Sequence, residues 1–212
     1  MARGFFITLE GVEGSGKTTQ ARRLADALSE RGYSVLLTRE PGATALGGAL
    51  RGLLLDSQLR LEPAAELLLM LADRAQHVRE QLQPALAASQ IVVSDRYSDS
   101  TTAYQGYGRG FDLKLLSELN RLAAADTIPD FTVVLDCAIE LGLARTRKRQ
   151  TNAGAADRFE SERSEFHQRV RDGFLAIARA ESGRVTVLDS SRPLEQVAAE
   201  ILHLTIQRIG AR

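Results

Sequence analysis

Residues 11–18 form a glycine-rich stretch that matches the pattern G-x-x-x-x-G-K-[ST] in full. Glycines at these positions let backbone N–H groups converge on phosphate oxygens, and the N-terminus of a following helix adds a positive dipole end. In such a loop Lys17 bridges the outer phosphates of a nucleotide, and Thr18 holds a magnesium ion. The alternative is a glycine-rich turn between a strand and a helix that binds no ligand.

Asp95 and Arg96 are a second candidate pair, at the end of the apolar run Ile91–Ser94. An aspartate at the carboxyl end of a buried strand, facing a phosphate loop, is a candidate magnesium ligand. It could instead cap the N-terminus of a following helix. Arg96, at the same sheet edge, is best explained as a second phosphate clamp. The chain has no N-K-x-D sequence, so guanine recognition of the GTPase kind is unsupported.

Short apolar runs alternate with longer segments in which apolar residues recur every three or four positions. Runs that are apolar on both faces and separated by helices predict a parallel sheet covered by helices. The expected strands are Phe5–Leu9, Ser34–Thr38, Ile91–Ser94, Phe131–Leu135 and Val185–Leu188. The expected helices are Lys17–Arg31, Leu46–Leu55, Ala64–Ser89, Leu113–Ala125, Glu140–Arg149, Glu160–Glu181 and Pro193–Ile209. The composition of Gln150–Ala156 predicts a poorly structured segment.

The composition limits the class of protein. The 27 basic and 27 acidic residues balance to a net charge of zero, which argues against a nucleic-acid coat or a polybasic membrane binder. A chain that is 44% apolar is not disordered, and its length predicts one domain over residues 1–212. The single cysteine excludes a disulfide framework and suits the cytoplasm. No apolar stretch approaches the ~18 residues of a transmembrane helix.

Arginine dominates the basic residues, with 24 Arg against three Lys. Genome composition explains such an excess, and so does the use of arginine forks to bind phosphate. Residues 145–158 hold five basic residues and one acidic residue beside the poorly structured segment.

With these motifs the chain resembles thymidylate kinases, which convert dTMP to dTDP with ATP. Four motifs carry the resemblance: the phosphate loop with Glu13 inside it, Thr-Arg-Glu-Pro-Gly at 38–42, the stretch from Asp95 to Gly106, and the basic residues at 145–160. The similarity runs from about residue 4 to 205. It implies an α/β P-loop kinase fold with a five-stranded parallel sheet in the order 2-3-1-4-5. It also implies a lid at about 145–160, a Mg²⁺ cofactor, a homodimer and the bacterial type of catalysis with a lid arginine.

The resemblance assigns residues to the acceptor nucleotide. Glu13 would accept a hydrogen bond from the 3′-hydroxyl of dTMP, Arg51 and Arg96 would hold its phosphate, and Arg74 would donate to thymine O4. Thr101 and Gln105 would lie at the base edge. Tyr104 would pack under the deoxyribose and exclude a 2′-hydroxyl. Met70 stands where many members have a phenylalanine that stacks on thymine, and its sulfur can lie over an aromatic ring.

The resemblance also assigns residues to ATP and to catalysis. The residues expected to bind ATP are Gly11, Val12, Glu13, Gly14, Ser15, Gly16, Lys17, Thr18 and, nearer the adenine, Arg145. Arg149 aligns best with the lid arginine that reaches the transferring phosphoryl group, and Arg158 is the second candidate. Lys17 and Arg96 complete the catalytic set, and Thr18 and Asp95 the magnesium shell. Glu40 is a further candidate for the magnesium or phosphate network, whereas His77 is assigned no role.

Two other classes stay open. Among enzymes, the alternatives are another nucleoside monophosphate kinase or a deoxynucleoside kinase; the deoxynucleoside kinase also combines a phosphate loop with an Asp-Arg motif. It phosphorylates a neutral 5′-hydroxyl, so it needs a carboxylate base and no monophosphate clamp such as Arg51. A non-catalytic ATP-gated module would not need the base-edge residues Arg74, Thr101 and Gln105.

Overall fold

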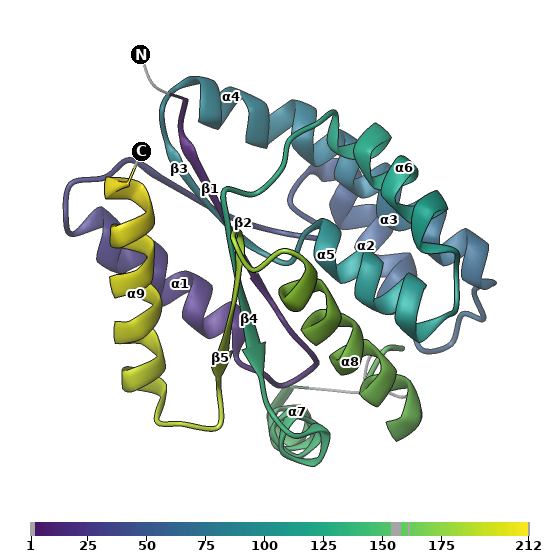
Figure 1. Ribbon diagram of the computed structural model, residues 1–212. Coiled ribbons are helices and arrows are strands. Elements are labelled where there is room, and N and C mark those ends of the chain that lie inside the picture. Colours follow the sequence, from purple (N-terminus) through teal and green to yellow (C-terminus); the bar gives the residue numbers. More distant parts are fainter. Residues whose placement is uncertain (1–2, 154–157, 161, 212) are drawn as a thin grey trace.

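The computed structural model describes residues 3–153, 158–160 and 162–211; side chains at 149–153 lie outside the description. Its centre is a five-stranded parallel sheet in the order β2-β3-β1-β4-β5 (Figure 1). The strands are β1 Phe5–Glu10, β2 Val35–Arg39, β3 Ile91–Asp95, β4 Phe131–Asp136 and β5 Val185–Asp189. Each contains or nearly contains the corresponding predicted run. The predicted strand order 2-3-1-4-5 is confirmed.

The register of the sheet places the ends of its central strands side by side. Leu9 of β1 pairs with Asp95 of β3, and Arg39 of β2 pairs with the same residue. The strands are parallel, so the loops that follow β1, β2 and β3 leave from one edge. The loop after β1 is the phosphate loop, and Glu40 and Arg96 follow β2 and β3. The register therefore brings the candidate residues to one edge of the sheet.

Helices cover both faces of the sheet (Figure 1). One face carries α1 Lys17–Ser29 and α9 Leu194–Gly210, whose Leu24, Leu28 and Ile201 pack with the sheet in one core cluster. The other helical elements are α2 Ala45–Leu55, α3 Pro63–His77, η1 Val78–Leu82, α4 Gln83–Ala87, α5 Ser98–Thr101, η2 Thr102–Gly108, α6 Leu113–Ala124, α7 Ile139–Ala153 and α8 Ser164–Ala180.

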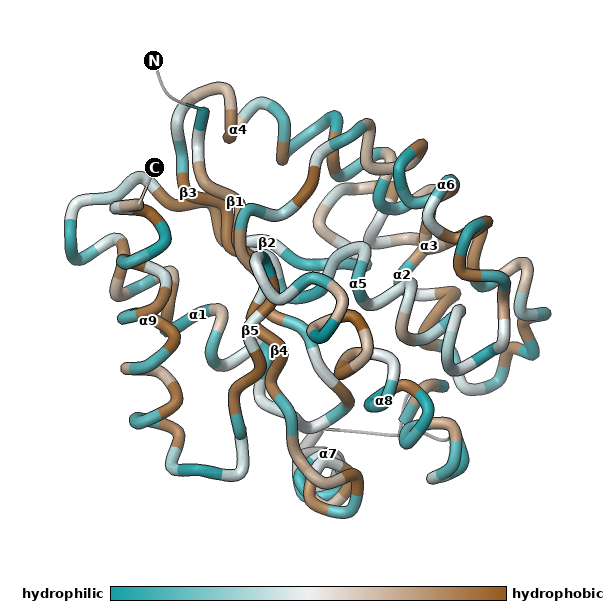
Figure 2. Tube along the Cα trace, in the orientation of Figure 1, coloured by the Kyte–Doolittle hydropathy of each residue, from teal (hydrophilic) through white to brown (hydrophobic). Residues whose placement is uncertain are grey.

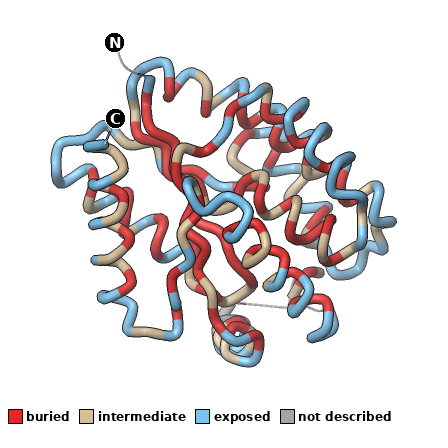
Figure 3. The backbone as a smooth tube through the Cα atoms, in the orientation of Figure 1, coloured by how far each residue is buried: buried red, intermediate tan, exposed pale blue. Residues whose placement is uncertain are grey.

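The central strands β1, β3 and β4 are mostly apolar and almost entirely buried, as Figures 2 and 3 show, whereas the edge strands β2 and β5 are partly exposed. Phe6, Ile7 and Leu9 of β1 are fully buried although they face both sides of the sheet. This double burial is what the continuous apolar runs predict. In the described part of the chain, no helix is long and apolar enough to cross a membrane.

Two predictions about the helices need correction, and one helical segment was not predicted. The predicted helix Ala64–Ser89 is helical from residue 63 to 87, but it is not α-helical throughout, because the π-helical turn η1 lies between α3 and α4. Residues 98–108, for which no helix was predicted, are helical throughout. Gln150–Ala153, predicted to be poorly structured, are the last residues of α7; residues 154–156 of that prediction lie outside the described residues.

Candidate functional site

The phosphate loop closes on itself between β1 and α1. Gly11, Gly14 and Gly16 have positive φ angles of 138°, 70° and 95°, which side chains other than glycine rarely adopt. The buried Lys17 ammonium donates to the Val12 carbonyl at 2.7 Å and to Ser15 Oγ at 3.3 Å. Burial, helped by the charge of Arg96, lowers the pKa of Lys17 to about 8. The loop is thus preformed around a cation.

Thr18 and Asp95 meet beside this loop. Thr18 Oγ1 donates to Asp95 Oδ2 at 2.5 Å, across the gap between α1 and the end of β3. Asp95 does not cap a helix, because the N-cap residue of α5 is Tyr97. A hydroxyl and a carboxylate oxygen are ligands that magnesium accepts, so this pair fits the predicted ion. No cluster of three or more His, Cys, Asp or Glu ligands occurs among the residues the structure describes.

Arg96 joins the phosphate loop to residues 98–108. Its backbone has a φ of 72°, and its guanidinium donates to the Gly11 carbonyl at 3.1 Å and to Ser100 Oγ at 3.0 Å. Its Nη2 donates to Glu13 Oε1 at 2.7 Å and contacts the Tyr104 hydroxyl at 3.0 Å. The left-handed backbone conformation at Arg96 thus directs its guanidinium toward the phosphate loop.

The ion pair with Arg96 explains how the phosphate loop can hold a carboxylate, Glu13. Burial alone would raise the pKa of Glu13, but Arg96 and Lys17 outweigh burial and lower that pKa to about 2. Tyr104 also donates its hydroxyl to Glu13 Oε1 at 2.7 Å. Glu13 is therefore ionised at neutral pH, and its charge is balanced before any nucleotide binds.

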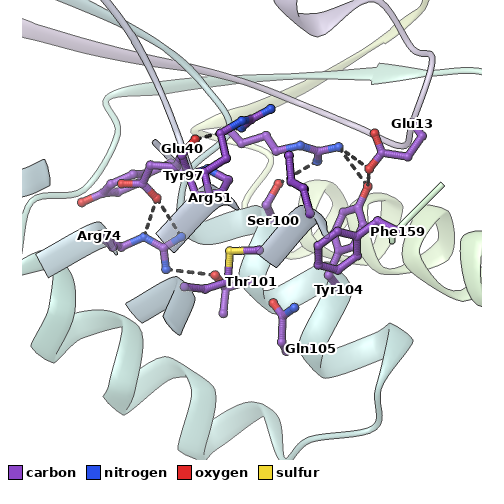
Figure 4. A pocket seen from close by; sticks show the side chains of 14 residues that line it. Glu13, Glu40, Arg51, Arg74, Tyr97, Ser100, Thr101, Tyr104, Gln105 and Phe159 are labelled. Carbon is purple, nitrogen blue, oxygen red and sulfur yellow. Dashed lines mark hydrogen bonds and ion pairs between the residues drawn. The ribbon is translucent and has the colours of Figure 1, made fainter. Parts of the chain in front are cut away.

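All eight residues predicted to bind the acceptor nucleotide line one cavity of about 110 Å³, here called the arginine-lined cavity (Figure 4). They are Glu13, Arg51, Met70, Arg74, Arg96, Thr101, Tyr104 and Gln105. Its other lining residues are Glu40, Pro41, Leu55, Tyr97, Ser100 and Phe159. A second cavity, the phosphate-loop cavity, is lined by Lys17, Thr18 and Asp95 among others. The two cavities share Glu13, Glu40, Arg51 and Arg96, so they meet at a wall that carries two arginines.

Arg51 reaches this wall from α2. Its Nη1 donates to the Pro41 carbonyl at 2.8 Å. Gly42, with a φ of 109°, lets the side chain pass, because a Cβ there would lie 2.8 Å from Arg51 Cδ. The loop after β2 and the helix that follows it therefore place Arg51 between the two cavities.

The far end of the arginine-lined cavity is built around Arg74 (Figure 4). Nε and Nη2 of Arg74 both lie 2.9 Å from Glu40 Oε2, and Nη1 donates to Thr101 Oγ1 at 2.9 Å and to Asn120 Oδ1 at 2.6 Å. Glu40 Oε1 in turn lies 2.9 Å from His77 Nδ1. Glu40 thus fixes Arg74 although it also borders the phosphate-loop cavity. His77, given no role from the sequence, supports that carboxylate.

A thymidylate kinase family model matches residues 9–201 of this chain. The chain belongs to the thymidylate kinase family. It is similar to the thymidylate kinase of Solidesulfovibrio magneticus, with 54% identity over 92% of this chain and 96% of that protein. It is 52% identical to that of Carboxydothermus hydrogenoformans, over 94% of this chain and 95% of that one. The crystal structure of thymidylate kinase from Ehrlichia chaffeensis matches with a TM-score of 0.77 at 37% identity, covering 96% of this chain and 98% of that one.

Membership makes this chain a nucleotide-binding kinase of nucleotide biosynthesis. Thymidylate kinases use ATP to phosphorylate dTMP to dTDP, and the deoxynucleoside kinase alternative is not favoured. ATP is thus the co-substrate.

Of the three arginines expected in the lid, two are placed by contacts and one is not. Both Nη atoms of Arg145 lie 3.1 Å from the Ser190 carbonyl, in the loop after β5. Arg158 donates from Nε to the Leu54 carbonyl at 3.0 Å and from Nη1 to Glu66 Oε2 at 2.6 Å, and it lines neither cavity. Arg149 lies in α7, but its side chain is outside the described residues.

Phe159 lines the arginine-lined cavity and Glu66 holds one of its lining residues, and the sequence predicted a role for neither. The Phe159 ring lines the arginine-lined cavity and contacts the Tyr104 ring edge-on at 5.7 Å between centroids. Glu66 is completely buried and accepts from Gln105 Nε2 at 2.8 Å. For Phe159 the available signal was an aromatic residue next to the basic lid motif. For Glu66 it was a carboxylate in an otherwise apolar stretch of helix.

Proposed function

We propose that this chain transfers the γ-phosphoryl group of ATP to dTMP at the wall shared by its two cavities. The observation that most supports this is the gathering of all eight expected acceptor residues in one cavity that adjoins the phosphate loop. Arg51 and Arg96 would hold the dTMP phosphate and screen its repulsion from the ATP phosphates. A nucleoside acceptor would not need a monophosphate clamp such as Arg51.

The ATP half of the proposal uses the phosphate loop. Backbone N–H groups of residues 11–16 and the Lys17 ammonium would bind the phosphates, and Arg145 would lie nearer the adenine. Thr18 and Asp95 would hold the magnesium ion, since their oxygens already lie together. The ion, when bound, supplies positive charge to the phosphate oxygens of ATP.

The dTMP half uses side chains from several elements. Ionised Glu13 would accept from the 3′-hydroxyl, and Tyr104 would pack under the deoxyribose. Arg74, Thr101 and Gln105 would contact the base edge. Met70 would lie over the thymine ring.

The proposed chemistry is an in-line attack by a dTMP phosphate oxygen. The acceptor is already ionised at neutral pH, so no general base is assigned. Lys17, Arg96 and a lid arginine would neutralise the charge that spreads over the γ-oxygens. Arg149 is our choice for the lid arginine, because Arg158 would first have to leave Glu66. Closure of a lid at about 145–160, within a single domain spanning 1–212, would exclude water.

We further propose that the chain is a cytoplasmic homodimer. The exposed leucines Leu68 on α3 and Leu122 on α6, 62% and 79% exposed, support an apolar face that a second copy would cover. Sedimentation of the wild-type chain and of a Leu122→Glu variant tests this, because the substitution should shift the population towards monomer.

A substrate panel tests the proposed reaction directly. ATP consumption is measured with dTMP, thymidine and the other nucleoside monophosphates, with and without Mg²⁺. We expect Mg²⁺-dependent turnover with dTMP and none with thymidine. Turnover with thymidine but not with dTMP would overturn the proposal.

A further inference from the structure

A buried carboxylate on α3 lies behind the base end of the arginine-lined cavity. Glu66 is fully buried in the first turn of α3 and does not line the cavity itself. Its partner Gln105, on η2, does line the cavity, and Figure 4 shows the Gln105 amide directed toward the other lining residues. Glu66 therefore contacts the cavity only through the side chain that it holds.

The hydrogen bonds of Glu66 leave its carboxylate no freedom to turn. Oε1 accepts from Gln105 Nε2 at 2.8 Å and from Arg109 Nε at 3.2 Å. Oε2 accepts from Arg109 Nη2 at 3.0 Å and from Arg158 Nη1 at 2.6 Å. A carboxylate has about four acceptor sites, and all are in use here. The arginines and the Gln105 amide outweigh the effect of burial and lower the pKa of Glu66, so it stays ionised.

An ionised carboxylate can only accept hydrogen bonds, and this decides which end of the Gln105 amide it takes. The NH₂ group must face Glu66, because the carbonyl end would place two acceptors in contact. The carbonyl Oε1 of Gln105 is then the end that remains for the cavity. The amide of a free glutamine could present either end, so its orientation is a property of Glu66 and not of Gln105 alone.

We infer that Glu66 is a specificity-determining residue, which presents the Gln105 carbonyl as a fixed acceptor and so selects a pyrimidine with a protonated N3. This inference rests on the proposed function, in which Gln105 contacts the base edge. Thymine carries N–H at N3 and suits an acceptor there. Cytosine has an unprotonated N3, which would oppose the Gln105 carbonyl. Arg74, a donor at the same end, suits O4 of thymine and opposes the 4-amino group of cytosine.

The Arg74 network acts in the same direction but through a separate set of partners. Glu40 and Asn120 accept from Arg74, whereas Glu66 accepts from Gln105 and two other arginines. A change at Glu66 therefore alters how Gln105 presents its carbonyl acceptor to the base, and it leaves the donor Arg74 in place. This separation lets the contribution of Glu66 be measured by itself.

The test is the ratio of kcat/KM for dTMP to kcat/KM for dCMP in the full-length enzyme. In Glu66→Gln, the new amide can donate as well as accept, so Gln105 can present either end to the base. We expect the ratio to fall on the order of tenfold, the scale of one hydrogen bond. Gln105→Met should lower the ratio similarly, and adding Glu66→Gln to Gln105→Met should lower it no further.

Arg109→Gln is the matched control. It removes one ion pair of Glu66, with its two hydrogen bonds, but leaves the bond from Gln105 in place. It should lower the thermal midpoint while the dTMP to dCMP ratio stays at the wild-type value. If Glu66→Gln does not fold, Glu66→Asp keeps a carboxylate for the arginines and withdraws it from Gln105, so the ratio should again fall.

The outcomes separate this inference from the proposed function. If the wild-type enzyme does not phosphorylate dTMP, the proposed function is wrong. If the wild-type enzyme phosphorylates dTMP, and folded Glu66→Gln and Glu66→Asp variants keep the wild-type ratio of kcat/KM for dTMP to that for dCMP, only the inferred role of Glu66 is wrong. A further drop when Glu66→Gln is added to Gln105→Met would also overturn it, because Glu66 would then act by another route.

Discussion

In the phosphate loop, the Lys17 ammonium bonds to groups two and five residues away in the chain. In the arginine-lined cavity, Arg74 bonds to residues 27 and 46 positions away, and Tyr104 reaches Glu13 across 91 positions. The first region is made by local backbone geometry and can be recognised from eight consecutive letters. The second exists only once the sheet has brought distant segments together, so each of its residues depends on several others.

Arg96 is where the two regions join, and its loss should have the largest effect. Arg96→Met removes a proposed phosphate clamp and leaves the partly buried Glu13 without its main counter-charge. We expect kcat/KM for dTMP to fall by about ten-thousandfold, because a lost transition-state contact and a broken, partly buried ion pair act together. Steady-state kinetics measure this. Arg179→Met, which changes an exposed arginine on α8 that lines neither cavity, is the control. A loss below tenfold would mean that the two regions work independently.

The same variant should change how stability depends on pH. The folded-state pKa of Glu13 is about 2 and its ordinary value is 4.5, so Glu13 contributes stability above pH 4.5 that is lost as the pH falls toward 2. Without Arg96 the folded-state pKa of Glu13 rises toward its ordinary value, so this loss of stability below pH 4.5 should become smaller in the variant. Urea unfolding between pH 3 and 7 measures the difference between the two pH profiles. Parallel profiles for variant and wild type would show that Arg96 does not control the charge of Glu13.

Lys17→Met tests the local region alone. We expect kcat to fall about a thousandfold, the scale for losing a donor aimed at transition-state charge. KM for dTMP should change little, because the Lys17 contacts lie within the loop. Measuring kcat and KM separately decides this. A rise in KM for dTMP as large as the fall in kcat would show that the loop also shapes the distant cavity.

Arg149→Ala tests whether the proposed lid acts on the phosphates bound at the phosphate loop. We expect kcat to fall at least about a hundredfold with little change in dTMP affinity, since the proposed contact forms only as charge develops. Arg158→Ala is the matched comparison, and because Arg158 is bound to Glu66, it should mainly affect stability and the cavity. A near-normal kcat in Arg149→Ala, with a large loss in Arg158→Ala, would reverse the assignment.

The contrast between the regions also explains what the sequence could predict. Apolar runs predicted the strands, since a strand buried on both faces has few polar residues, and Gly11–Thr18 predicted the loop. The helical course of residues 98–108 could not be predicted, because its polar residues are fixed by partners elsewhere, such as Ser100 by Glu10 and Tyr104 by Glu13. The hydrogen bonds that Glu66 accepts from three side chains could not be predicted either, because these partners lie 39 to 92 positions away in the sequence.

Met70→Phe should give the smallest effect and tests the one departure from the family pattern. Met70 lines the arginine-lined cavity and packs with the cluster that contains Tyr104 and Phe159. A phenyl ring there would stack on thymine, which is worth about 1 kcal/mol more than burial alone, so we expect KM for dTMP to fall about fivefold. The thioether already offers a polarizable contact, and this limits the gain. Met70→Leu, which removes the sulfur at similar volume, should raise KM severalfold. If both variants kept the wild-type KM for dTMP, the residue would not touch the base, and the cavity would hold thymine by its edge alone.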